Sequence, residues 1–267
     1  MTDNEKNQQP AGQQTPRKVG AARFFELMGR DLWSFYKASI LCCLGFVPAF
    51  LAVLFGILAG AVWISLLGGA VGGLIAAPFL CGMMDTVLRA LRDEPGYWWH
   101  TYRGAWKQNW RDALVPGALS GALLGLWCWV LMALPDMENV PTSVWVCMIV
   151  GGAVLVGFFS YLFAQLVLVS LPLSRLLRNS ALFFLGFFPR TLAATLVQCV
   201  YWVPVLMYMP YTLPVLLVTG FWLPVVIALQ ILYPGLDRAF DLESTIRQRR
   251  DEELQARMAG RDAQDET

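Results

Sequence analysis

Long apolar runs and short charged segments alternate along the chain. Asp, Glu, Lys and Arg are absent from four stretches: 38–84, 113–135, 139–174 and 191–236. A helix that crosses a bilayer needs about 20 mostly apolar residues. The first and last stretches are each long enough for two such helices, and the other two are each long enough for one. Because the runs are continuously apolar rather than alternating, they favour helices over strands.

The pattern therefore predicts an all-α fold, a polytopic membrane helix bundle with about six transmembrane helices and amphipathic cytoplasmic surface helices. The predicted spans are 39–59, 64–84, 114–134, 145–169, 191–209 and 213–234. The polar ends of the chain predict three parts: a disordered tail at 1–22, an integral membrane domain at 23–240 and a charged cytoplasmic tail at 241–267.

Basic residues predict the orientation. All 20 Lys and Arg residues lie before the first span, between spans two and three, between spans four and five, or after span six. With six spans these four segments share one side of the membrane. The positive-inside rule makes that side the cytoplasm, so we expect both termini there.

Composition argues against two classes of protein. Charged residues are 15% and hydrophobic residues 57% of the chain, and the mean hydropathy is +0.53. Soluble domains carry about 25% charged residues, so the composition argues against a soluble globular enzyme and excludes a disordered chain. The net charge of +1 gives no reason to expect a nucleic-acid partner.

Three segments outside the spans have helical spacing. Residues 22–37 are either a helix on the membrane surface or the start of the first span, and 171–190 predict a short amphipathic helix. Residues 97–112 predict a helix with an aromatic arc beside a basic arc. These arcs contain Trp98, Trp99, Tyr102, Trp106 and Trp110, and Arg103, Lys107 and Arg111.

Two interpretations of the helix at 97–112 stay open. Trp and Tyr favour the headgroup level and basic side chains favour an anionic leaflet, which predicts membrane anchoring. Trp, Tyr and Arg are also frequent at the centres of protein interfaces, which predicts partner docking.

Glycines predict close helix packing. Gly117, Gly121 and Gly125 form a GxxxGxxxG series, and 68–73 contains two overlapping GxxxG pairs. Such residues let two helix backbones approach closely. The contact is either within one chain or between two copies, so the sequence leaves the oligomeric state open.

Few residues are candidates for chemistry. The single histidine, His100, has no metal-ligating neighbour at ligand spacing, and we predict no catalytic, cofactor-binding or metal-binding residue. The candidate polar groups inside the membrane are Gln165, Gln198 and Gln230, which either bond helices together or line a path for a neutral solute.

The sequence resembles the YesL-like family of bacterial integral membrane proteins, a domain of unknown function. The similarity rests on FFELMGRDLWSFYKASIL at 24–41, APFLCGMMDTVLRALRDEPGYWWHTYRGAWKQNWRDAL at 77–114 and PLSRLLRNSALFFLGFFPRTL at 172–192. The chain departs from the family at Ala38-Ser39, where members often have Asn-Leu. The resemblance implies the bacterial cytoplasmic membrane and an accessory role beside a sugar ABC transporter.

Three functions remain as hypotheses. The first is a non-enzymatic membrane protein that assembles with other membrane proteins. The second is a small carrier or channel for a neutral solute, and the third is a lipid-acting membrane enzyme. A continuous polar cleft lined by the three glutamines favours the second hypothesis, and a dry bundle favours the first.

Overall fold

The computed structural model describes residues 18–94, 96–169, 171–208, 211–245, 248, 251–252 and 255. In these ranges every regular element is a helix. The elements are α1 (Ala21–Leu58), α2 (Val62–Arg92), α3 (Trp98–Ala133), the short 3-10 helix η1 (Leu134–Asp136), α4 (Thr142–Leu168), α5 (Leu173–Gly186), α6 (Phe188–Met207), α7 (Leu213–Thr219) and α8 (Trp222–Phe240).

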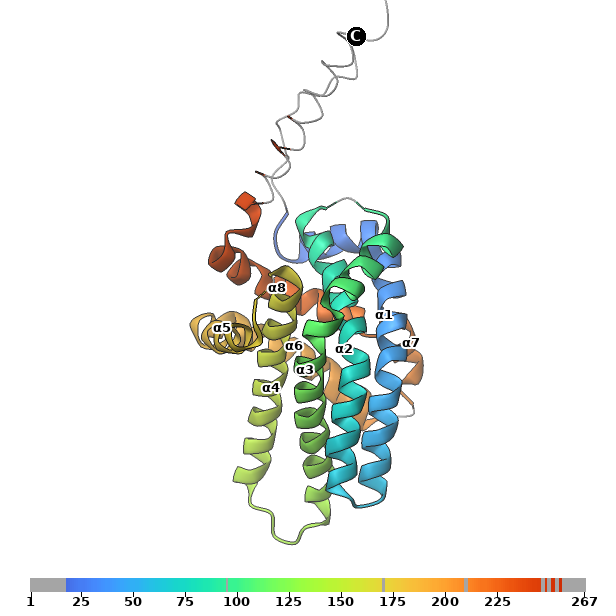
Figure 1. Ribbon diagram of the computed structural model, residues 1–267. Helices are drawn as coiled ribbons and strands as arrows, with labels where there is room; N and C mark the ends of the chain where they lie inside the picture. The colour runs from blue at the N-terminus through green and yellow to red at the C-terminus, as the bar shows by residue number, and fades with distance from the viewer. Residues whose placement is uncertain are drawn as a thin grey trace, which may run out of the picture.

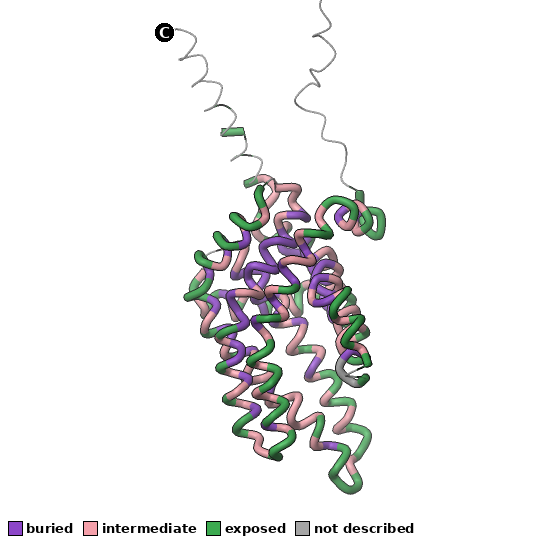
Figure 2. The backbone as a smooth tube through the Cα atoms, turned by 90° about the vertical axis from the view of Figure 1, so that its right-hand side faces the viewer, coloured by how far each residue is buried: buried purple, intermediate pink, exposed green. Residues whose placement is uncertain are grey.

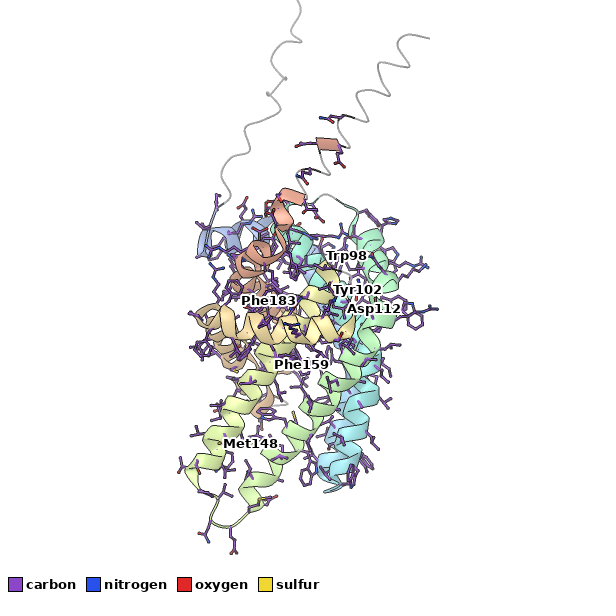
Figure 3. The ribbon with its side chains drawn as sticks, turned by 60° about the vertical axis from the view of Figure 1, so that its left-hand side comes forward. Trp98, Tyr102, Asp112, Met148, Phe159 and Phe183 are labelled. Carbon is purple, nitrogen blue, oxygen red and sulfur yellow. The ribbon has the colours of Figure 1, made fainter. Side chains whose placement is uncertain are left out.

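The helices α1, α2, α3 and α4 stand side by side and alternate in direction (Figure 1). The start of α1 and the end of α8 lie at the same end of this bundle, which we call the charged end because ion pairs join α1 to α2 there. The helix α5 lies across the upright helices, as the views in Figures 1 and 3 agree.

Length and apolarity support a multi-pass membrane protein. In the described part of the chain, five helices are long and apolar enough to cross a bilayer. A sixth is added if α5 and α6, which meet at 97°, count as one bent span. The predicted spans at 39–59, 64–84, 114–134 and 145–169 each lie within, or within one residue of, one long helix.

The predicted span at 213–234 is wrong as a single helix. The chain breaks after α7 at Gly220, whose φ of 48° is a conformation that side chains disfavour. Polar side chains bind the backbone groups at the break: the Phe221 amide donates to Ser39 Oγ (2.9 Å), and Tyr201 Oη donates to the Gly220 carbonyl (2.7 Å). Such partners allow a helix to be interrupted away from water.

Two predicted surface segments are not separate helices. Residues 22–37 form the first turns of α1, which lie across the charged end before the helix turns down the bundle (Figure 1). Residues 98–112 continue without interruption into the predicted third span as α3. The link is Asp112-Ala113-Leu114, which contains no Gly or Pro to end a helix, so the α-helical hydrogen bonds continue.

The GxxxG glycines pack within the chain. A Cβ atom added at Gly73 would lie 2.1 Å from the Gly117 carbonyl oxygen, and one added at Gly121 would lie 2.1 Å from the Gly69 carbonyl oxygen. The second pair on α2 faces α1 instead, where a Cβ at Gly72 would lie 2.2 Å from Ala49 Cα. The backbones of three neighbouring helices therefore touch, which is the intrachain alternative of the two that the glycine spacing left open.

Large side chains fill the rest of the core. Tyr161 and Leu162 of α4, Leu176 of α5, and Leu229 and Leu232 of α8 are at most 2% exposed. Figure 2 shows that buried residues gather in the half of the molecule toward the charged end, whereas the opposite half is mostly exposed or intermediate.

The structure describes only part of the two predicted tails. The disorder predicted for 1–22 falls mainly on residues 1–17, which lie outside the described residues, and α1 already begins at Ala21. Most of 246–267 also lies outside them.

Candidate functional site

An ion-pair cluster joins the first turns of α1 to the end of α2. Arg23 Nη2 donates to both carboxylate oxygens of Asp93 (2.8 Å each) and to the Leu91 carbonyl (3.0 Å). Arg30 donates to the same carboxylate and, through Nη2, to the Ala90 carbonyl (2.8 Å). Because one carboxylate binds two arginines of α1, this contact holds the two helices together across the charged end.

Asp93 directly follows the last residue of α2 and caps the end of that helix. It has a φ of 56°, and its amide bonds back to the last turn of the helix. Partial burial acts to raise the pKa of Asp93, but the hydrogen bonds and charges of Arg30 and Arg23 outweigh it and hold the pKa below its ordinary value of 3.8. The carboxylate is therefore the charged acceptor at neutral pH.

A second part of the cluster lies on α2 itself. Arg89 Nε donates to Asp85 Oδ2 (2.8 Å) and Nη1 to Glu94 Oε2 (3.1 Å), and Arg92 also binds Glu94. The Asp85 side chain is only 6% exposed, so the i, i+4 pair with Arg89 supplies the counter-charge that a buried carboxylate needs.

A polar cavity of about 330 Å³ opens beside this cluster. It lies between α1, the end of α2 and the start of α3. Its lining includes Arg30, Asp31, Ser34, Arg89, Glu94 and Trp98.

The aromatic arc of α3 is divided between the interior and the surface. Tyr102 is 3% exposed and packs against Gly82 of α2, where an added Cβ would lie 2.6 Å from its ring. Trp98 and Trp106 are half-buried. The Trp106 ring meets the Phe79 ring edge-on, with 6.2 Å between the two ring centres. Figure 3 shows Trp98 and Tyr102 toward the charged end of the molecule. Tyr102 and Trp106 therefore fix the start of α3 on α2, while Trp98 lies under the Lys37 ammonium of α1, 5.3 Å from its ring centre.

The remaining side chains of this helix form an exposed face, which we call the aromatic-basic face. It consists of Trp99 and Trp110, which are 46% and 41% exposed, with Arg103, Lys107 and Arg111. The Arg111 guanidinium lies 5.2 Å from the centre of the Trp110 ring, a cation–π distance. His100 is also exposed.

The three glutamines have separate partners. Gln165 is buried and donates to Ser180 Oγ of α5 (3.0 Å), and Gln198 donates to Ser160 Oγ of α4 (2.9 Å). Gln230 donates to the Gly20 carbonyl (2.7 Å). None of them lines the 330 Å³ cavity, and a second cavity of about 10 Å³ touches Gln198 alone among them.

Sequence reasoning missed the ion-pair cluster and the cavity. The Asp85–Arg89 spacing was a visible local signal, since i, i+4 residues meet on one helix face. The Arg23–Asp93 contact joins positions 70 residues apart, and no local pattern encodes it. Within the described ranges, no three His, Cys, Asp or Glu side chains are grouped as a metal site would require.

One family matches part of the chain. The family described as "Protein of unknown function, DUF624" matches residues 56–131, which include α2, most of α3 and the connection between them. No curated protein and no solved structure matches the chain. The match thus covers the glycine contact, the end of α2 and the aromatic-basic face.

Proposed function

We propose that this chain is a non-enzymatic, multi-pass protein of a bacterial cytoplasmic membrane that assembles with other membrane proteins through the aromatic-basic face. The proposal includes cytoplasmic termini and a YesL-like identity, which the DUF624 similarity does not contradict. The partner that the sequence resemblance implies is a sugar ABC transporter, with this chain as its accessory component.

The observation that carries the proposal is the division of the α3 aromatics. Tyr102 and Trp106 hold the helix on α2, while Trp99 and Trp110 remain exposed beside three basic side chains. A rigid surface that presents Trp and Arg is the type of surface whose residues dominate binding energies. Its basic charge favours a partner with acidic side chains.

The glutamine contacts give less support to the solute carrier. Each glutamine bonds a different element, and two of these bonds join neighbouring helices, which is the ordinary role of amides in membrane bundles.

Co-purification from native membranes tests the docking role. We expect the double variant Trp99→Ala, Trp110→Ala to recover at least about tenfold less of its crosslinked partner than the unaltered chain, since each exposed Trp at a hot spot contributes about 2 kcal/mol or more. The control is Trp63→Ala, which removes a tryptophan that is 69% exposed at the start of α2. Equal recovery in both variants, with unchanged folding, contradicts docking through this face.

A further inference from the structure

The 330 Å³ cavity at the charged end has walls of both signs. Arg30 and Arg89 contribute positive charge, and Asp31, Asp93 and Glu94 contribute negative charge. Trp98 forms an aromatic wall. None of the five residues of the aromatic-basic face lines this cavity, so a ligand bound here is independent of the proposed function.

Arg89 offers unused donors. A guanidinium has five N–H groups. Arg89 uses Nε for Asp85 and Nη1 for Glu94, and within the described part of the chain Nη2 donates to no acceptor. Both bonds fix the plane of the guanidinium group. The remaining N–H groups therefore have a fixed direction in which they can donate to an oxyanion such as phosphate.

Asp31 offers an unused acceptor. Its Oδ2 accepts from Arg30 Nε (2.7 Å), and no donor among the described residues reaches Oδ1. A carboxylate oxygen that accepts no other hydrogen bond can bind an ammonium group that carries N–H donors. Trp98 also lines the cavity, and the Lys37 ammonium lies 5.3 Å from the centre of its ring.

The two signs together select the ligand. Both signs occur together on each wall, since Arg30 pairs with Asp31 on α1 and Arg89 pairs with Glu94 at the end of α2. A simple anion therefore also meets carboxylates, and a simple cation also meets guanidinium groups. A zwitterion satisfies both, if its phosphate and its ammonium are joined by a short link. The volume lies at the lower end of the range for ligand pockets, about 300–1,000 Å³, so a headgroup fits and a whole lipid does not.

The surroundings place the cavity near a headgroup layer. Trp33 of α1 and Tyr97, just before α3, are 67% and 78% exposed at this end of the bundle. Exposed Trp and Tyr at the ends of apolar helices favour the level of the lipid headgroups.

We propose that the cavity binds a phosphoethanolamine group, with phosphate at Arg30 and Arg89 and the primary ammonium at Asp31. The group comes either from phosphatidylethanolamine or from free phosphoethanolamine. Choline has no N–H to donate to Asp31, and phosphatidylglycerol has no cation, so both bind more weakly.

Thermal unfolding of the full chain in detergent tests the cavity. Short-chain phosphatidylethanolamine, phosphatidylcholine, phosphatidylglycerol and soluble phosphoethanolamine are titrated separately, because a ligand that binds the folded state raises the unfolding midpoint. For the unaltered chain we expect half-maximal stabilisation by phosphatidylethanolamine at about tenfold lower concentration than by the other two lipids, which corresponds to one charge-assisted hydrogen bond.

Two variants separate the cavity from general stability. Ser34 lines the cavity and makes no hydrogen bond with the described residues, so Ser34→Leu fills the space without breaking a contact, and Ser34→Ala is its matched control. We expect Ser34→Leu to lose the preference for phosphatidylethanolamine and Ser34→Ala to keep it. Asp31→Asn is expected to bind phosphatidylethanolamine and phosphatidylcholine alike.

The outcomes are decisive in both directions. Equal stabilisation by the three lipids, or a preference that survives in Ser34→Leu, overturns the proposal. If soluble phosphoethanolamine competes as well as the lipid, the cavity binds the free compound. If only the lipid acts, the cavity binds a headgroup.

Discussion

Backbones meet where α2 contacts α3, whereas large side chains fill the core to which α4, α5 and α8 contribute. In the first contact, a Cβ added at Gly73 would lie 2.1 Å from the Gly117 carbonyl oxygen. In the second region, Tyr161 of α4 and Leu229 of α8 are at most 1% exposed, and the Tyr161 ring meets Phe183 of α5. Backbone atoms cannot rotate away as side chains can, so the glycine contact fixes the register of α3 on α2, and the side-chain core can relax.

This difference bears on the aromatic-basic face. The face lies on the same continuous helix as Gly117 and Gly121, so the glycine contact sets where Trp99 and Trp110 project. The buried side chains of α4 and α8 lie on other helices than the aromatic-basic face. The two regions should therefore respond differently to substitution. Two experiments measure the difference and a third measures the ion pairs at the charged end, from the largest expected effect to the smallest.

Enlarging a glycine should break the α2–α3 contact. We expect Gly73→Leu to destabilise the chain by more than about 3 kcal/mol, above the usual range for overpacking, because the opposing atom is backbone. The control is Gly151→Leu on α4, where an added Cβ meets nothing within 4 Å. Unfolding in mixed micelles measures the stability of both purified variants. Similar stabilities would show that α2 and α3 can move apart at little cost in free energy.

Truncating a side chain in the α8 core should cost less. We expect Leu229→Ala to lower the free energy of unfolding by about 2 kcal/mol, near the low end for a Leu→Ala cavity, because lipid is itself apolar and only packing is lost. The same micelle titration applies. A loss as large as that of Gly73→Leu would remove the distinction between the two regions.

The ion pairs at the end of α2 should add the smallest amount. Asp93→Asn removes a carboxylate whose side chain is 30% exposed, so we expect a loss on the order of 1 kcal/mol at neutral pH. Because folding lowers the pKa of Asp93, its stabilisation is present above the ordinary value of 3.8 and is lost as the pH falls through the folded value.

Acid unfolding provides the check. The unaltered chain should lose stability relative to Asp93→Asn below about pH 4, so that the two midpoints converge in acid. A constant difference between them down to about pH 2 would mean that the carboxyl charge contributes nothing.

Sequence reasoning predicted the long helices because their signal is local. Continuous apolar runs located α1 to α4, and the GxxxG spacing marked the glycines that α2 and α3 bring together. Helical periodicity also placed the α3 aromatics on one arc. It could not show that α2 covers part of this arc, since the place of Tyr102 against Gly82 depends on how two helices pack.

The break in the last predicted span had no distinctive local signal. Gly220, which has a positive φ, is one of 23 glycines in the sequence. The next amide, that of Phe221, donates to Ser39, which lies 182 positions away. The cavity at the charged end likewise needs α1 folded back over the end of α2. Features made by distant partners were therefore the ones that local patterns in the sequence could not reveal.

The helix α5 has a consequence for the shape of the surrounding bilayer. It crosses the upright helices, and the molecule is broader on that side of its midline than at the loop between α3 and α4 (Figure 1). In a membrane, such a molecule takes more lateral area from one leaflet than from the other. A wedge of this kind is accommodated best where the membrane bends away from the broad end, so the crosswise helix predicts a preference for curved bilayers.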